Sequence, residues 1–215
     1  IQVATPGLIA IHLTYTPERQ RIAIQKKGRL YQASMDFLLS RGLTFAQNGR
    51  SLIVSSENAD IDLIYLRDDD IPEYVSRGVA DFGIVGENVL AEKGAGLSVV
   101  AKLGFGECSL MIAVPQGSRI QEPADLEGKR IATTYPKLLS EYLRKTGVEA
   151  HIVPISGSAE ITPELDLADA VCDIVQTGDT LKAHGLVPVF TVMKSQAVLV
   201  QSPEASRGKE ELLRQ

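Results

Sequence analysis

The chain has 215 residues, which is enough for one large domain or two compact lobes, each with its own buried core. Its 44% hydrophobic and 23% charged residues are typical of a folded globular protein, and no apolar run approaches the roughly 20 residues that a membrane-spanning helix needs. The net charge of -5 argues against sequence-independent binding of nucleic acid, which depends on an excess of Lys and Arg. We therefore predict a soluble protein with neither a membrane nor a nucleic-acid partner.

The first 20 residues form an extension whose role the sequence does not assign. They lack the basic start and the continuous apolar core of a secretion signal, so we predict a cytoplasmic protein. Ile9, Ile11, Leu13 and Tyr15 alternate with period two, which predicts a strand or one arm of a hairpin.

After Gln20, short apolar runs alternate with helical segments, and Gly or Pro residues mark the breaks. The predicted strands of the first half are 21–25, 51–55, 60–67, 81–86, 97–103 and 108–115, and its helices lie between 29 and 42 and at 71–78. The predicted strands of the second half are 129–133, 150–155, 170–175, 187–193 and 195–201, and its helices are 136–146, 180–185 and a polar tail after Pro203. This alternation predicts an α/β architecture with mostly parallel sheets.

Cysteine and histidine offer no reactive constellation. Cys108 and Cys172 each lie inside an apolar run, and we predict inert core thiols rather than a disulfide or a nucleophile. His12, His151 and His184 have no metal-ligand spacing, so we predict structural roles for them. The sequence also lacks a nucleophile elbow, a Walker loop and a dinucleotide fingerprint, which argues against a serine hydrolase, a P-loop kinase and a Rossmann dehydrogenase.

The stretch "DIVQTGDTL", residues 173–181, runs from a predicted strand into a small, hydroxyl-rich turn. Ligands of open α/β sheets bind beyond the carboxyl ends of the strands, where backbone amides and hydroxyls can converge on an anion. A plain helix N-cap by Thr177 or Asp179 is the simpler explanation of the turn taken alone. The residues of this predicted phosphate turn are Gln176, Thr177, Gly178, Asp179, Thr180 and Leu181.

Three carboxylates, Glu160, Asp169 and Asp173, precede the phosphate turn. A carboxylate near a phosphate is costly unless it accepts hydrogen bonds from sugar hydroxyls or holds a metal, and a phosphorylated ribose meets both needs. A solvated helix position is the alternative for Asp169. That alternative is weaker for Asp173, because an unpaired carboxylate inside a strand is expensive.

Cationic residues follow the strands of the first half. Lys26, Gly28 and Arg29 come directly after the first predicted strand, and Arg50 and Arg67 each fall beside another strand. The arginine fork suits bidentate binding of phosphate or pyrophosphate. Each residue alone fits an ordinary surface position, but together they predict the cationic half of a phosphate site.

From Arg21 to about Val200 the sequence resembles the catalytic region of the ATP phosphoribosyltransferases. The matching motifs, in the family's order and spacing, are "RIAIQKKGRL", "RDDDIPEYVSRGVADFGIVGENVL", "GKRIATTYPKLLSEYL", "GSAEITP" and "LADAVCDIVQTGDTLKAHGL". The resemblance implies a two-lobed fold like that of the type II periplasmic binding proteins, with the active site in the cleft between the lobes. Lobe I would comprise residues 1–107 and 194–215, and lobe II would comprise residues 108–193.

The resemblance also implies the activity. The phosphoribosyl group of 5-phosphoribosyl 1-pyrophosphate (PRPP) would be transferred to N1 of ATP with release of pyrophosphate, the first step of histidine biosynthesis. No strong general base is needed because N1 carries no proton at neutral pH. Catalysis would come from holding two anionic substrates in line and from neutralising pyrophosphate with Mg²⁺ and arginines.

The resemblance assigns the site residues by group. Arg29, Arg50 and Arg67 would be the catalytic residues, around the pyrophosphate and the ATP phosphates. The phosphate turn would hold the 5-phosphate of PRPP, with Glu160, Asp169 and Asp173 on the ribose side. The residues expected to contact ATP or pyrophosphate are Lys26, Gly28, Arg29, Asp70 and Tyr135. Mg²⁺ is expected to bind through substrate phosphates, and no protein side chain is assigned as a metal ligand.

The sequence departs from the family at three positions. The family more often has glycine at 166 and alanine at 162, where this chain has Asp166 and Thr162. Asp179 adds a negative charge to the phosphate turn, and we expect its side chain to point outward.

The resemblance leaves the assembly open. We expect a homodimer or a higher oligomer, and a regulatory subunit resembling histidyl-tRNA synthetase if the chain is a short form of the enzyme. An isolated catalytic core of the long form, which carries a C-terminal histidine-sensing domain, is the alternative. A non-catalytic nucleotide or anion binder on the same fold is the competing class of function.

Overall fold

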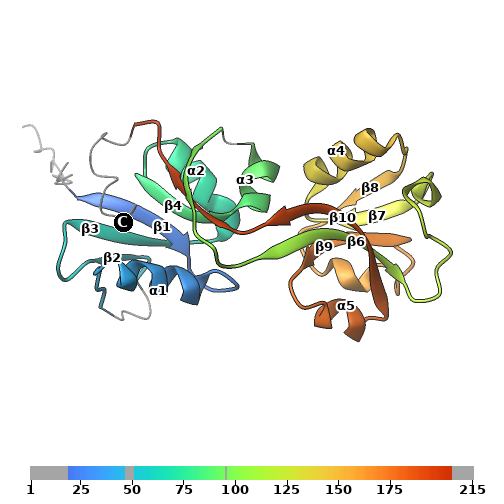
Figure 1. Ribbon diagram of the computed structural model, residues 1–215, viewed down its shortest axis with the longest axis horizontal. Helices are drawn as coiled ribbons and strands as arrows, with labels where there is room; N and C mark the ends of the chain where they lie inside the picture. Colours follow the sequence, from blue (N-terminus) through green and yellow to red (C-terminus); the bar gives the residue numbers. More distant parts are fainter. Residues whose placement is uncertain (1–18, 47–50, 95, 205–215) are drawn as a thin grey trace, which may run out of the picture.

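The computed structural model describes residues 19–46, 51–94 and 96–204, which form two lobes side by side along the long axis (Figure 1). Arg50, the strand predicted near the N-terminus and the helix predicted after Pro203 lie outside the described residues. None of the described helices is long and apolar enough to cross a membrane.

The first lobe is built on a six-stranded sheet with the order β2-β3-β1-β4-β11-β5. Its strands are β1 (Gln20–Gln25), β2 (Ile53–Ser55), β3 (Ile61–Leu66), β4 (Phe82–Gly86), β5 (Ser98–Lys102) and β11 (Ala197–Gln201). Its helices are α1 (Tyr31–Ser40), the short 3₁₀ turn η1 (Asp68–Asp70), α2 (Ile71–Ser76) and α3 (Glu87–Lys93). The strands β1, β3 and β4 each end where a loop or helix with polar residues begins, as expected for an α/β sheet.

The second lobe is built on a five-stranded sheet with the order β10-β6-β9-β7-β8. Its strands are β6 (Cys108–Pro115), β7 (Arg130–Thr133), β8 (His151–Pro154), β9 (Ala170–Val175) and β10 (Leu186–Ser195). Its helices are η2 (Pro123–Leu126), α4 (Pro136–Thr146), η3 (Ala159–Ile161) and α5 (Asp179–Ala183). The apolar periodicity of α4 places Leu138, Leu139 and Leu143 on one buried face.

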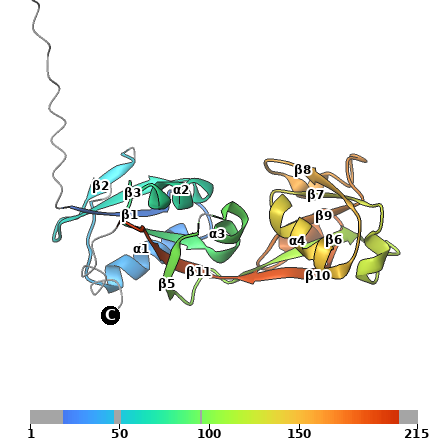
Figure 2. The same ribbon diagram turned by 90° about the horizontal axis from the view of Figure 1, so that it is seen from above.

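The two-lobed α/β fold is confirmed, but the sheets are mixed rather than mostly parallel. β1 pairs in parallel with β3 and β4, and β7 pairs in parallel with β8 and β9. The strands near the crossings between the lobes, β6, β10 and β11, pair antiparallel with their neighbours. Only Gln196 separates β10 from β11, so one extended segment supplies an antiparallel strand to each sheet (Figure 2). Such a strand needs no crossover helix, which a parallel connection requires.

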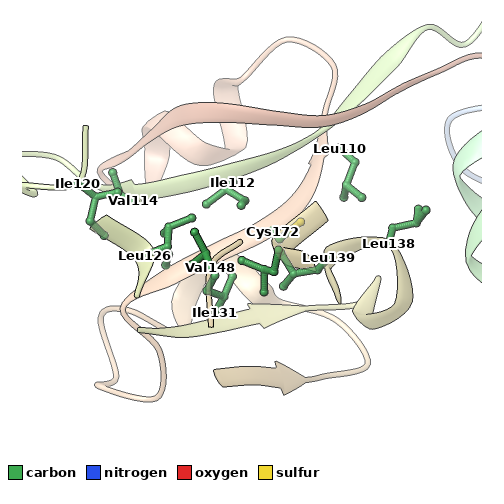
Figure 3. Packing of buried hydrophobic residues seen from close by; sticks show 12 residues of the cluster. Leu110, Ile112, Val114, Ile120, Leu126, Ile131, Leu138, Leu139, Val148 and Cys172 are labelled. Carbon is green, nitrogen blue, oxygen red and sulfur yellow. The ribbon is translucent and has the colours of Figure 1, made fainter. Parts of the chain in front are cut away.

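The core of the second lobe lies between its sheet and α4 and includes Ile112, Ile131, Leu139 and Cys172 (Figure 3). Cys108 and Cys172 are both buried and unpaired, as predicted. Burial raises the pKa of the Cys172 thiol to about 12, so this thiol stays protonated at neutral pH.

Candidate active site

Val175, the last residue of β9, pairs with Ser109 at the start of β6, where the chain enters the second lobe. β7 pairs in parallel with β9, so the carboxyl ends of both strands lie at this edge, toward the first lobe. The backbone amides of Lys137 and Leu138, at the start of α4, donate to the carboxylate of Glu92 in α3, both at 2.9 Å. The ammonium group of Lys137 also donates to the carbonyl oxygen of Ala91 at 2.9 Å. Figure 2 shows α3 and α4 on the facing sides of the two lobes. The strand ends of the second lobe therefore open toward α3.

Tyr135 stands at this edge, directly before α4. Its backbone amide donates to the hydroxyl of Thr133 at 2.9 Å, and that hydroxyl donates to the carbonyl oxygen of Cys172 at 2.7 Å. The Tyr135 hydroxyl oxygen accepts a hydrogen bond from Nδ2 of Asn88 in the first lobe at 3.0 Å. The sequence placed Tyr135 in the cleft, and the structure puts it in contact with both lobes.

Negative charges from both lobes act on the Tyr135 hydroxyl. Burial raises the pKa of its hydroxyl well above the ordinary value, and the negative charges of Asp173, Asp68 and Asp69 raise it further. Asp173 belongs to the second lobe, whereas Asp68 and Asp69 lie in η1 of the first lobe. Tyr135 therefore remains a neutral hydrogen-bond donor at any physiological pH.

Asp173 lies near the end of β9, half buried. Burial raises the pKa of its carboxyl, the backbone amide of Ile174 lowers it through a hydrogen bond of 2.7 Å, and the charge of Glu160 raises it. Glu160 is half buried in η3. The structure thus brings together the two carboxylates that the sequence assigned to a ribose.

The phosphate turn follows directly. Gly178 precedes α5 with φ 84°, a left-handed conformation that favours glycine, and Gln176, Thr177 and Thr180 are exposed. The Thr177 hydroxyl donates to the Asp179 carboxylate at 2.7 Å, and Asp179 is exposed. The Thr177 hydroxyl is therefore occupied by Asp179 in this structure. An anion that binds the Thr177 hydroxyl would have to replace Asp179 as its hydrogen-bond partner.

Leu181 lies at the phosphate turn but its side chain is buried, whereas Asp169 lies away from the turn. The Leu181 side chain is 5% exposed and packs in the core, so only its backbone can take part in binding. Asp169 precedes β9 and so lies at the opposite end of that strand from Gln176. It accepts hydrogen bonds from the backbone and guanidinium of Arg130, at 2.8 to 3.2 Å, and these bonds lower its pKa. Asp169 is a structural partner of Arg130, and the sequence missed this because proximity along the chain does not reveal the strand's direction.

The two positions before β9 that depart from the family have local explanations. Asp166 adopts φ 55°, where glycine is unstrained, and its carbonyl oxygen accepts a hydrogen bond from Arg130 at 2.7 Å. Thr162 is 4% exposed, and its hydroxyl donates to the carbonyl oxygen of Ala159 at 2.7 Å. The backbone at Asp166 therefore has the conformation that glycine favours, and Thr162 has an ordinary φ of -64°.

In the first lobe, Arg29 lies between two glycines. Its guanidinium donates to the carbonyl oxygen of Gly106, and a Cβ built on Gly86 would lie 3.4 Å from Arg29 Nη2. Gly28 has φ 112°, a conformation that side-chain-bearing residues rarely adopt, so the backbone favours glycine at this position. Burial and the charge of Asp69 raise the pKa of Asp68. The positive charge of Arg29 acts in the opposite direction and lowers that pKa. Arg29 therefore faces the same acidic group as Tyr135.

The other predicted cations lie at the matching edge of the first sheet. The last residues of β1 and β3 are paired, and the backbone amide of Lys26 donates to the carbonyl oxygen of Leu66 at 2.8 Å. Lys26 and Arg67 follow these paired residues and are exposed. Asp70 is exposed at the end of η1, and Arg50 lies outside the described residues.

A cavity of about 640 Å³ lies where the chain passes between the lobes. Its lining residues are Glu87, Lys102, Glu107, Cys108, Ser109, Val175, Gln176, Lys194, Ser195 and Gln196. Gln176 connects this cavity to the phosphate turn. Lys102 is paired with Glu87 at 2.9 Å, and Lys194 adds an exposed positive charge to the wall.

Sequence reasoning gave no role to Asn88, Glu92 or Lys194. Asn88 stood inside the quoted motif "GENVL", directly after a predicted strand, and that position at a carboxyl end was the signal available. The role of Glu92 depends on a contact with the other lobe that no local pattern reveals.

Within the described ranges, no group of three or more His, Cys, Asp or Glu side chains is placed to hold a metal ion. Asp173 and Glu160 form a pair only. Their carboxylate oxygens are of the ligand type that Mg²⁺ prefers.

Comparisons with known proteins agree on one family. A family model described as "HisG: ATP phosphoribosyltransferase" matches residues 67–215. The ATP phosphoribosyltransferase of Maricaulis maris is 48% identical over 189 residues, covering 85% of this chain and 64% of that protein. The enzyme of that name from Cytophaga hutchinsonii is 45% identical over 193 residues, covering 90% of this chain and 68% of that protein. The chain thus spans about two thirds of the length of these relatives.

Solved structures give the same result. A chain of the "ATP phosphoribosyl transferase (HisG:HisZ) complex from Thermotoga maritima" is 33% identical, with a TM-score of 0.75 and coverage of 89% of this chain and 92% of that chain. The periplasmic aliphatic sulphonate binding protein SsuA from Escherichia coli is 18% identical, with a TM-score of 0.59 and coverage of 87% and 62%. The second likeness shows the fold alone, and it confirms the resemblance to periplasmic binding proteins.

Proposed function

The chain belongs to the ATP phosphoribosyltransferase family, and on that premise we propose that it transfers the phosphoribosyl group of PRPP to N1 of ATP with release of pyrophosphate. This reaction is the first step of histidine biosynthesis, and the proposal places it in the cytoplasm. One observation carries the proposal: side chains of both lobes come together at one place. Tyr135, Asp173 and Glu160 come from lobe II, and Asn88 and Arg29 come from lobe I. The lobe boundaries at 107/108 and 193/194 are part of the proposal.

The residues divide the work by substrate. The phosphate turn binds the 5-phosphate of PRPP, for which the Thr177 hydroxyl leaves Asp179. Asp173 and Glu160 accept hydrogen bonds from the ribose hydroxyls, which relieves the mutual repulsion of their charges. Asp169 is not included, because it is committed to Arg130.

The cations of lobe I bind the negatively charged phosphate groups of both substrates. Arg29 and Arg67 hold the pyrophosphate of PRPP and the phosphates of ATP, with Lys26 and Asp70 at the edge of the same surface. In the reaction, N1 of adenine forms a bond to the anomeric carbon, and the bond from that carbon to pyrophosphate breaks. The bonding electrons leave with pyrophosphate, whose developing charge the arginines stabilise. Mg²⁺, when bound, would neutralise charge on the pyrophosphate, and no protein side chain is assigned to hold it.

The proposed enzyme works as an assembly of subunits. The Thermotoga maritima relative was solved in a HisG:HisZ complex, and a subunit like HisZ is the partner we expect for this chain if it is a short form. A homodimer or higher oligomer is the expected state of the catalytic chain. Size-exclusion chromatography with light scattering, with and without such a subunit, tests both expectations.

The proposal is tested by mixing the protein with ATP, PRPP and Mg²⁺, with pyrophosphatase present to remove one product. Phosphoribosyl-ATP is followed by its absorbance and identified by its mass. Formation of this product supports the proposal. Saturable binding of PRPP without product, both alone and with a HisZ-like subunit, overturns it in favour of a non-catalytic binder.

A further inference from the structure

Asn88 joins three elements of the site through one buried side chain. It is 1% exposed and lies in the first turn of α3. Its Nδ2 donates to the Tyr135 hydroxyl at 3.0 Å, and its Oδ1 accepts from the Ser195 hydroxyl at 2.7 Å. Its backbone amide donates to the same Ser195 oxygen at 3.1 Å. The two lobes and the returning segment are therefore linked by one amide.

Ser195 decides which end of the Asn88 amide faces Tyr135. Ser195 is 5% exposed, and its oxygen already accepts a hydrogen bond from the Asn88 backbone. Its own hydrogen needs an acceptor, and Asn88 Oδ1 is the acceptor that it has. If the amide were turned over, Nδ2 would face a Ser195 oxygen that already accepts from the Asn88 backbone amide, and the Ser195 hydrogen would lose its acceptor within the protein and have to find one in the cavity that Ser195 lines, which is less favourable. The Nδ2 group is therefore held toward Tyr135.

This arrangement leaves the hydroxyl hydrogen of Tyr135 free. The Tyr135 oxygen is the acceptor in its bond with Asn88, so its hydrogen must be donated elsewhere. In the described part of the chain no acceptor receives it. The Asn88 bond fixes the oxygen as acceptor, and the negative charges of Asp173, Asp68 and Asp69 act on the same hydroxyl.

We propose that Asn88 and Ser195 are positioning residues that direct the hydroxyl hydrogen of Tyr135 into the cleft, where it is donated to an anionic oxygen of the pyrophosphate group. This inference rests on the proposed function for the identity of that ligand. Tyr135 is the residue that touches the ligand, and Asn88 and Ser195 act through it. If the Asn88 side-chain amide were rotated by half a turn, its oxygen would face Tyr135. Tyr135 would then donate its hydrogen to Asn88 and present only lone pairs to the anion.

The experiment measures binding of Mg²⁺-pyrophosphate by isothermal titration calorimetry, together with kcat/KM for phosphoribosyl-ATP formation. Tyr135→Phe is expected to weaken binding about tenfold, because it removes a hydrogen bond to a charged group. Ser195→Ala is expected to cause a similar loss, since it frees the amide to turn. The double variant Tyr135→Phe/Ser195→Ala is expected to bind no more weakly than Tyr135→Phe alone.

Two further variants sharpen the test. Asn88→Asp provides a carboxylate that accepts from both hydroxyls, so it should match Tyr135→Phe even if Ser195→Ala does not fold. Tyr142→Phe, in α4 and packed against the core of lobe II, serves as the control and should bind like the wild type. Thermal unfolding followed by circular dichroism confirms that each variant is folded.

The outcomes separate this inference from the proposed function. Fully additive losses in the double variant, or unchanged binding in folded Ser195→Ala and Asn88→Asp, overturn the positioning role. Absence of pyrophosphate binding by the wild type overturns it as well. If the wild type binds pyrophosphate with the expected coupling but never forms phosphoribosyl-ATP, the positioning role stands and the proposed function fails.

Discussion

The carboxylate of Glu92 accepts a hydrogen bond from the backbone amide of Lys137 at 2.9 Å, so a side chain of one lobe caps α4 of the other. Tyr135, at the N-cap position of α4, makes no side-chain cap of its own. An uncapped helix start leaves amides without partners, and a negative charge there also interacts favourably with the helix dipole. Glu92 therefore stabilises α4 and holds the two lobes together at the same point.

Replacing Glu92 with alanine should lower the free energy of unfolding by about 1 kcal/mol, similar to the loss of an ordinary N-cap. Urea unfolding followed by circular dichroism measures the change. Glu57→Ala is the matched control, because Glu57 is exposed and its side chain has no hydrogen bond or ion pair in the described structure. Equal stability of the two variants would show that the contact between the lobes contributes nothing.

Ser34 offers a stabilising substitution. It is 0% exposed in α1, and its hydroxyl has no hydrogen-bond partner in the described structure. Ser34→Ala removes this buried hydroxyl and introduces the residue with the highest helix propensity, so the free energy of unfolding should rise by about 1 kcal/mol. The control is Ser40→Ala, which removes an exposed hydroxyl that donates to Phe37 at 2.7 Å. A Ser34→Ala protein no more stable than Ser40→Ala would contradict the expectation.

The sequence predicted most of the elements because their signals are local. The alternating apolar runs and the Gly and Pro breaks predicted strands such as β1, β4 and β9, and Pro136 marks the start of α4 in the structure. The direction of pairing was harder to predict, because the antiparallel strands β10 and β11 come from one segment whose two halves join different sheets.

The site residues could likewise be predicted where their signal is local in the sequence, and were missed where it depends on a distant contact. Asp173 and Glu160 could be assigned from their places before the phosphate turn, and their electrostatic coupling in the structure agrees with a shared site. Asp169 was grouped with them because it is close in sequence, although a strand of several residues separates it from that edge. Asn88 and Glu92 were missed, because their partners lie in the other lobe.

Arg29 should be required for turnover but not for folding. Arg29→Lys keeps the charge but loses the fork that suits a pyrophosphate, so kcat/KM should fall by about 100-fold. Steady-state assays with ATP and PRPP measure this loss, and urea unfolding checks stability. Arg77→Ala serves as the control, since Arg77 is exposed and, among the described residues, its ion pair is with Glu73 on α2. Normal kcat/KM in the Arg29→Lys variant would remove Arg29 from the catalytic set.

Asp173 should limit stability while supporting activity. Its pKa is raised by burial and by Glu160, so the folded state holds its proton more tightly than the unfolded state does. The stability linked to this proton is present at acidic pH and is lost as the pH rises through the raised pKa. Asp173→Asn, which carries no charge, should therefore be more stable than the wild type at pH 7.

The pH dependence distinguishes this cause from a general packing effect. The stability gain of Asp173→Asn should shrink as the pH falls from 7 through the raised pKa, and it should vanish near the ordinary Asp value of 3.8. Urea unfolding at a series of pH values measures it, while turnover with PRPP should fall by about 100-fold because a ribose hydroxyl loses its charged acceptor. Asp36→Asn, at an exposed position on α1, is the control and should show neither effect. A gain that is constant across this pH range would mean that the charge of Asp173 is not its source.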